Sequence, residues 1–245
     1  MSFFRKHFAK APADAQRRGL GQWFEILEEK IMDLIRVNLM TVMCFCPALL
    51  CCDIGIRMKD IRLFILGIMF FVLAGPALTA MNRICMRMVL RLHYWCREDF
   101  WKCIRQEWKN SMILTGLLTV LWGAVLYSCF MMLLLDGGIS IFILLVFCIY
   151  IYLLIGFTVF SYQQLAMVDL PLKSVMKNAF LLIFSGGFRS AVMILCIMVL
   201  LIWSYLHLIW TVPAFLIIGL AVTVMTCGVV CRREMEASLN LGEKE

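Results

Sequence analysis

Arginines recur every four residues in one charged stretch of this chain, at Arg83, Arg87 and Arg91. Residues four apart lie on the same face of a helix, so the three guanidinium groups would form a row. A guanidinium binds carboxylates and phosphates through two parallel hydrogen bonds. The row is therefore a candidate site for a phosphate group or an acidic partner. The alternative is a row of charges that lipid head groups and water solvate.

A second group of basic residues follows in the segment DFWKCIRQEWKN, residues 99–110. With helical spacing, basic residues occupy one face and apolar residues another: Lys102, Arg105 and Lys109 against Trp101, Ile104 and Trp108. Asp99 precedes the first turn as a candidate N-cap. Trp at the level of lipid head groups, with Lys and Arg beside it, is typical of a helix that lies on a membrane surface. We expect these basic residues to bind anionic lipid or a partner, with Trp101 and Trp108 as structural anchors.

Side chains that could perform catalysis or bind a metal are scarce. The sequence contains no G-x-S-x-G, H-E-x-x-H or P-loop motif. His93, Cys96 and Cys103 match no zinc-binding spacing and lack a fourth ligand. We therefore expect no metal, no cofactor and no enzymatic activity.

The composition is that of a chain surrounded by lipid. Hydrophobic residues make up 63% of it and charged residues 16%, and the mean hydropathy is +0.92. Soluble domains are about 45–50% apolar and about 25% charged. The formal charge of +7 is not read as nucleic-acid binding, because the basic residues lie in short segments between apolar stretches. In a membrane protein, such residues gather on the cytoplasmic side.

Six stretches have about the length and apolar character that a membrane-spanning helix needs. They are Leu34–Cys52, Ile61–Ala80, Met112–Leu135, Ile139–Phe160, Ser190–Leu208 and Val212–Val230. The first is the weakest, because Arg36 and Asn38 lie at its start, although Arg36 is long enough to extend to the interface. The sequence thus predicts an all-α, polytopic bundle of about six transmembrane helices, with amphipathic helices on its cytoplasmic face.

The connecting segments differ sharply in charge from one side of the membrane to the other. Four segments, namely residues 1–33, 81–111, 161–189 and 231–245, carry 19 Lys and Arg, as 6, 7, 3 and 3. The opposite loops carry two, Arg57 and Lys59. Because basic loops stay in the cytoplasm, both termini are expected there. The predicted parts are a cytoplasmic arm over 1–33, a membrane domain over 34–230 and a cytoplasmic tail over 231–245.

Further local signals concern single residues. Asp169 is expected to cap an amphipathic helix near 169–185, which would lie on the cytoplasmic surface like the one near 81–111. Gly75 and Pro76 are expected to kink or end a helix. Both are structural predictions.

Four motifs occur in an order typical of a known family: WFEILEEKIMDLIRVNLMTVMCFCPAL, GPALTAMNRICMRMVLR, DFWKCIRQEWKNS and VDLPLKSVMKNAFLLI. Together they cover most of the chain from Trp23 to about Leu195, and they resemble the YesL family of bacterial integral membrane proteins. This chain departs from the family pattern by the extra segment Asp53–Leu73. The resemblance implies a bacterial plasma-membrane protein without an established activity, linked by genomic context to carbohydrate uptake and breakdown.

The leading functional hypothesis is a non-enzymatic accessory or regulatory membrane protein of carbohydrate uptake, which binds a transporter subunit or a cytoplasmic regulator. A homo-oligomer stays open. The alternative is a small transporter or facilitator for a neutral or amphiphilic solute. The spans lack Asp and Glu, which argues against ion-coupled transport. A path for a neutral solute could use the hydroxyl groups of Tyr127, Ser128, Tyr150, Tyr152, Thr158, Ser204 and Tyr205.

Overall fold

The structure is a computed structural model that describes residues 20–134, 141–168, 170–185, 187–207 and 212–230. Over these ranges all regular elements are helices, which confirms the all-α class. Five of the described helical stretches are long and apolar enough to cross a membrane: Gly21–Met58, Ile61–Val89, Cys96–Cys129, Leu145–Met167 and Val212–Val230. Each overlaps a predicted span, so the chain is a multi-pass helical membrane protein.

The remaining predicted span, Ser190–Leu208, overlaps helix α7, which runs from Gly187 to Leu206. Helix α7 is not among the five stretches above, and Leu208 lies outside the described residues. The sixth span therefore stays a prediction.

Helix α1 runs without a break from Leu20 to Met58. Its 39 residues are about 58 Å long at about 1.5 Å per residue, roughly twice the hydrocarbon thickness of a bilayer. The sequence predicted a separate amphipathic arm before Leu34, but the structure has no boundary there. Residues 22–46 contain neither Gly nor Pro, so nothing stops the helix from continuing out of the membrane.

Helices α2, Ile61–Leu73, and α3, Gly75–Val89, meet at Ala74, so the Gly75–Pro76 pair lies at the first turn of α3. Proline suits a first turn because its missing N–H would have no partner there. A Cβ atom on Gly75 would overlap Thr115 Oγ1 and lie 2.7 Å from Thr115 Cβ. Glycine thus lets the start of α3 pack directly on α4.

Helix α4, Cys96–Leu134, also has 39 residues. The segment 99–110, predicted as a separate surface helix, forms part of the first four turns of α4 instead. No Gly or Pro occurs between Cys96 and Thr115 to separate it from the span. The predicted N-cap is also wrong, because α4 begins three residues before Asp99.

Helix α5, Ile141–Met167, is followed by α6, Leu172–Ser185, and then by α7. The buried residues of α6 include Val175, Ala179 and Ile183, and Ile183 lies close to Gly156 of α5. Its outer side carries Lys173 and Lys177 first and Phe180, Leu181 and Phe184 later. Helix α6 therefore has a buried apolar face, and its exposed face is basic in the first half and apolar in the second.

The chain returns to α1 through a π-helical turn, η2, Phe215–Gly219, and α9, Leu220–Val230. Asn38 of α1 is fully buried and donates hydrogen bonds to the carbonyls of Phe215 and Leu216 at 3.1 and 2.8 Å. Its Oδ1 atom accepts one from the Ala221 amide at 2.9 Å. This polar residue thus ties α1 to the backbone of the π-helical turn and of the first turn of α9.

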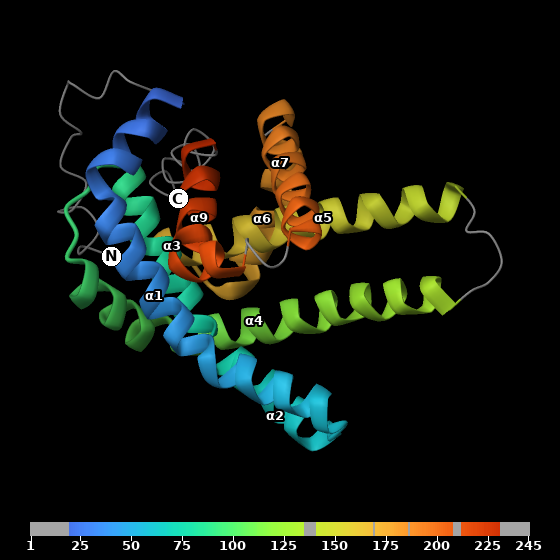
Figure 1. The fold of residues 1–245 in the computed structure, drawn as a ribbon. Helices are drawn as coiled ribbons and strands as arrows, with labels where there is room; N and C mark the ends of the chain where they lie inside the picture. The colour runs from blue at the N-terminus through green and yellow to red at the C-terminus, as the bar shows by residue number, and fades with distance from the viewer. Residues whose placement is uncertain (1–19, 135–140, 169, 186, 208–211, 231–245) are drawn as a thin grey trace.

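Helix α3 lies at the centre and packs against α1, α4, α5 and α9 (Figure 1). The α1–α2 pair and the long α4–α5 pair extend from this centre in different directions (Figure 1). Large apolar side chains are exposed along these extensions, as at Met43, Ile65, Val120 and Ile149. Lipid is the medium that such surfaces require, since monomeric soluble proteins rarely expose so much contiguous apolar area.

Candidate functional site

The candidate site lies at the charged end of the bundle, which is formed by the first turns of α1 and α4 and the last turns of α3 and α5. The three arginines Arg83, Arg87 and Arg91 lie at this end. Each of them, however, is engaged with a carboxylate of the same chain. The pairs are Arg83–Glu107, Arg87–Asp99 and Arg91–Glu25, at 3.7, 2.7 and 2.7 Å.

Arg83 is the most enclosed of the three, with 12% of its side chain exposed. Its Nε atom donates a hydrogen bond to the Ala166 carbonyl at 2.8 Å, and Nη1 donates one to Gln106 Oε1 at 3.2 Å. Ala166 belongs to the last turn of α5, where carbonyls have no partner within the helix. A cation there also meets the negative end of the helix dipole. Arg83 thus holds α3, α4 and the end of α5 together.

Arg87 joins α3 to the start of α4. Its Nη1 atom donates to Asp99 Oδ2, which also accepts a hydrogen bond from the Trp95 amide at 2.9 Å. Asp99 therefore satisfies a free amide at the start of α4 from inside the first turn. Asp99 is thus not the N-cap that the sequence predicted, but its carboxylate still accepts a hydrogen bond from the amide that precedes the helix.

Arg91 ends α3 in a left-handed conformation, with φ of 53°. The Leu92 amide donates to the Arg87 carbonyl at 2.9 Å, and the Arg91 amide donates to the Met88 carbonyl at 3.1 Å. These two bonds form a Schellman motif, in which glycine is the usual residue at this position. The side chain of Arg91, whose backbone is strained, forms the ion pair with Glu25 of α1. All three arginines are therefore paired with carboxylates of the chain, and they do not form a row of unpaired guanidinium groups that could bind an oxyanion.

The basic residues of α4 have the opposite character. Lys102, Arg105 and Lys109 are exposed and form no ion pair with any residue that the structure describes. Trp101 and Trp108 are 46% and 49% exposed, and Lys109 Nζ lies 5.5 Å from the centre of the Trp108 ring. The buried face of this segment is formed by Phe100 and Cys103. We call the exposed residues Trp101, Lys102, Arg105, Trp108 and Lys109 the α4 basic face.

A shallow hollow of about 550 Å³ lies on the α4 basic face, lined by Arg97, Glu98, Trp101, Lys102, Arg105 and Gln106. Three cations and one carboxylate give its lining a positive balance. The first turn of α4, which contributes Arg97 and Glu98 to the lining, also carries the positive end of the helix dipole. This arrangement can bind an acidic group, and it contains no nucleophile next to a base.

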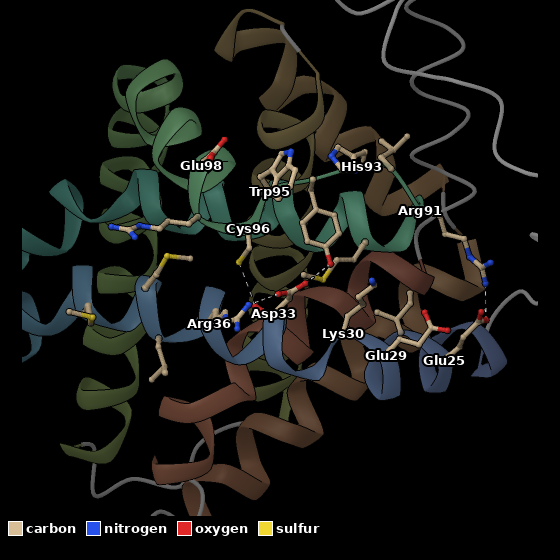
Figure 2. Close-up of a pocket in the computed structure, with 18 residues that line it drawn as sticks. Glu25, Glu29, Lys30, Asp33, Arg36, Arg91, His93, Trp95, Cys96 and Glu98 are labelled. Carbon is tan, nitrogen blue, oxygen red and sulfur yellow. Dashed lines mark hydrogen bonds and ion pairs between the residues drawn. The ribbon is translucent and has the colours of Figure 1, made fainter.

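A larger groove of about 1240 Å³ separates the first half of α1 from the segment that joins α3 to α4. Figure 2 shows Glu25 and Arg91 at one end of it, with Asp33, Arg36 and Cys96 further along. The apolar side chains that line it include Leu39, Met40 and Met43 of α1. We call this cavity the α1 groove. The α1 groove was not predicted from the sequence, because its two walls come from distant parts of the chain, as the 66-residue separation of Glu25 and Arg91 illustrates.

Asp33 is the polar centre of the α1 groove. Its Oδ2 atom accepts a hydrogen bond from the Tyr94 hydroxyl at 2.9 Å, and Oδ1 accepts one from Arg36 Nη1 at 3.4 Å (Figure 2). Burial raises the pKa of the Tyr94 phenol, and the hydrogen bond to Asp33 and its negative charge raise that pKa further. Tyr94 therefore stays protonated and acts as a fixed donor.

Three buried polar residues lie near the C-terminal end of α5. The side chains of Ser161, Gln163 and Gln164 are at most 1% exposed, and their polar atoms have no hydrogen-bond partner among the described residues. Near them, Thr115 Oγ1 lies 2.7 Å from the hydroxyl of Tyr162. These glutamines were not among the residues predicted to form a site. Their polarity next to an apolar span was the available signal.

Other predicted residues do not gather at a site. Tyr127 and Tyr150 are 65% and 37% exposed on the outer surfaces of α4 and α5, so they line no interior path. Thr158 accepts a hydrogen bond from Trp122 Nε1 at 3.2 Å, which joins α4 to α5. Asp169 lies outside the described residues. Within the described ranges, no three His, Cys, Asp or Glu side chains lie close enough together to hold a metal ion.

Comparison with known proteins found no family model, no curated protein and no solved structure that matches this chain.

Proposed function

We propose that this protein is a non-enzymatic accessory or regulatory component of the membrane, which binds another protein through the α4 basic face. The observation that carries the proposal is the contrast between two sets of cations at the same end of the bundle. The arginines of α3 are engaged in internal ion pairs, whereas Lys102, Arg105 and Lys109 are exposed and have none with the described residues.

Two tryptophans beside these cations strengthen the proposal. Trp and Arg are enriched among the residues that dominate binding energy at protein interfaces. Trp101 and Trp108 each lie about one turn from Arg105, on opposite sides of it along the exposed side of α4. An acidic partner with an apolar contact region complements this surface. Anionic lipid is the competing occupant, because Trp and Lys also suit a membrane interface.

The class of partner comes from the resemblance to the YesL family. We propose a bacterial plasma-membrane protein with both termini and the α4 basic face in the cytoplasm. Its partner would be a transporter subunit or a cytoplasmic regulator of carbohydrate uptake. The excess of Lys and Arg in the connecting segments at this end supports that orientation.

The test is affinity capture from native membranes after mild cross-linking. The double variant Lys102→Glu/Arg105→Glu reverses two exposed charges and removes no ion pair within the described chain. The matched control is Lys173→Glu/Lys177→Glu on α6, whose side chains are also exposed. We expect a component of a sugar-uptake system to be captured by the native chain and the control, and lost with the α4 variant. Recovery that is equal for all three chains, or recovery of no such component, would contradict the proposal.

A second candidate function, a facilitator for a small neutral solute, draws on the buried group Ser161, Gln163 and Gln164. Buried polar atoms without partners cost free energy unless water or a ligand satisfies them. Amide groups both donate and accept hydrogen bonds, as binding of a polyhydroxyl solute requires. Flux of sugars and polyols into proteoliposomes tests this function. Flux that falls in a Gln163→Leu/Gln164→Leu variant would support it, and no flux above that of empty liposomes would exclude it.

A further inference from the structure

The α1 groove changes in polarity along its length. Its first part is lined by charged residues of α1 and of the α3–α4 connection, such as Glu25, Glu29 and Arg91. Its other part is lined by Leu39 and Met43, which are 43% and 73% exposed. Met43 lies seven residues beyond Arg36, which is about 10 Å along the helix. A ligand that fills the groove must therefore be polar at one end and apolar at the other.

We propose that the α1 groove binds a phospholipid of the adjoining leaflet, of the zwitterionic class whose head group carries a phosphate and a primary ammonium. Such a lipid would place its phosphate between Arg36 and Arg97 and its ammonium at Glu98. Its acyl chains would lie against Leu39 and Met43. This inference does not rest on the partner proposed above, although Arg97 and Glu98 line both the α1 groove and the hollow on the α4 basic face.

The charges of the groove select the head group. Eight ionisable side chains that carry full charges line it, four acidic and four basic: Glu25, Glu29, Asp33 and Glu98, with Lys30, Arg36, Arg91 and Arg97. Two pairs are joined within the groove, Glu25–Arg91 and Asp33–Arg36. Glu29, Glu98, Lys30 and Arg97 form no ion pair with another described residue. The groove therefore offers carboxylates and cations in equal number, which complements a zwitterion and gives an anionic lipid no net attraction.

The α1 groove opens onto the lipid-facing side of α1, so its ligand can come from the membrane itself. Met43 belongs to the membrane-spanning part of α1, and its exposure makes the apolar part of the groove continuous with the lipid-facing side of that helix. Trp95 at the rim is 63% exposed, and Tyr94 lines the wall. Aromatic residues of this kind lie at the level of lipid head groups. A lipid of the leaflet can enter such a groove sideways without leaving the membrane.

The experiment uses the full-length chain, purified and stripped of lipid in detergent. It is titrated separately with phosphatidylethanolamine, phosphatidylcholine and phosphatidylglycerol of the same acyl length, and bound lipid is counted by native mass spectrometry. We expect phosphatidylethanolamine to bind about tenfold more tightly than phosphatidylglycerol, a ratio that corresponds to about 1.4 kcal/mol. Equal or tighter binding of phosphatidylglycerol would overturn the proposal.

Three variants assign the atoms. Glu98→Gln should weaken phosphatidylethanolamine selectively, whereas Arg97→Gln should weaken all three lipids, because each carries the phosphate. Arg105→Gln is the control, since Arg105 lines the neighbouring hollow and not the groove. These side chains form no ion pair with other described residues, so their replacement removes no such contact. An equal effect of Arg105→Gln and Arg97→Gln would place the lipid on the α4 basic face and overturn the proposal.

A second measurement does not depend on the charge variants. Phosphatidylethanolamine brominated near the head of its acyl chains should quench tryptophan fluorescence more than the matching phosphatidylglycerol. The difference should disappear in Trp95→Phe and persist in Trp203→Phe, whose ring lies on α7 beside His207. Quenching that is the same in native and Trp95→Phe protein would contradict a lipid in the groove.

Discussion

Replacement of Gly75 by alanine tests how closely the central helix α3 packs on α4. The added methyl group would overlap Thr115 Oγ1 and lie 2.7 Å from Thr115 Cβ and 3.1 Å from the Ser111 carbonyl oxygen. Thr115 and Ser111 are 1% and 0% exposed, so neither can move into open space. The helices must separate.

The expected cost combines strain and lost hydrogen bonds. Overpacking of a filled interior costs about 1–3 kcal/mol. Separation of α3 from α4 also weakens the hydrogen bond between Thr79 and Ser111, which is 2.8 Å long, and such a bond contributes about 0.5–1.5 kcal/mol. The higher helix propensity of alanine offsets up to about 1 kcal/mol. We therefore expect Gly75→Ala to lower the free energy of unfolding by roughly 1–3 kcal/mol.

The control is Gly116→Ala, one residue after Thr115 in α4. A Cβ atom there meets only Val72 Cγ1, at 3.7 Å, an ordinary contact. The assay is unfolding of the detergent-solubilised protein by heat or by a denaturing detergent. Gly116→Ala should be as stable as the native chain or slightly more stable. In a Thr115→Gly background, Gly75→Ala should cost less, because the two nearest atoms are gone. A Gly75→Ala protein as stable as Gly116→Ala would refute the packing argument.

Three other outcomes follow from the charged end of the bundle. Arg83→Met should lower the free energy of unfolding by about 1.5–3 kcal/mol, because it removes charge-assisted hydrogen bonds to an enclosed helix end. Arg105→Met on the exposed side should change the free energy of unfolding by at most about 0.5 kcal/mol. Thermal unfolding of the two variants in the same detergent compares them. Arg91→Gly should be more stable than Arg91→Ala by roughly 1 kcal/mol, since both lose the ion pair and only glycine accepts the left-handed backbone without strain. Equal stabilities of the two variants would argue against strain at that turn. The pKa of Tyr94 is raised above that of the unfolded chain, so its contribution to stability is present below the unfolded pKa and is lost as the pH rises through the folded pKa. An alkaline absorbance titration should show a late-ionising tyrosine that Tyr94→Phe removes, and an unchanged curve would contradict the buried hydrogen bond to Asp33.

Much of the fold follows from the sequence alone. Long apolar stretches predicted the all-α membrane class, because a chain in lipid must satisfy its backbone within helices. The ends of the helices were harder to predict. Nothing in residues 22–46 or 96–115 stops a helix, so α1 and α4 continue out of the apolar stretches, where a pattern based on hydrophobicity places a boundary.

The site was predictable only in part. Spacing put Arg83, Arg87 and Arg91 on one face of a helix. It could not show that Glu107, Asp99 and Glu25, from other helices, would occupy them. Spacing along one helix gives the direction of a side chain, whereas its partner depends on packing between helices. For the same reason the α1 groove, with walls from two distant segments, was absent from the sequence-based prediction.

The most direct test of the account is to measure on which side of the membrane the α4 basic face lies. Single variants Lys102→Cys and Lys59→Cys place a thiol at the start of α4 and at the turn between α1 and α2, and a membrane-impermeant maleimide is applied to intact cells and to permeabilised cells, with the unsubstituted chain as background. The account predicts that the Lys59→Cys protein reacts in intact cells and that the Lys102→Cys protein reacts only after permeabilisation. Reaction of the Lys102→Cys protein in intact cells would place the α4 basic face outside and contradict the account.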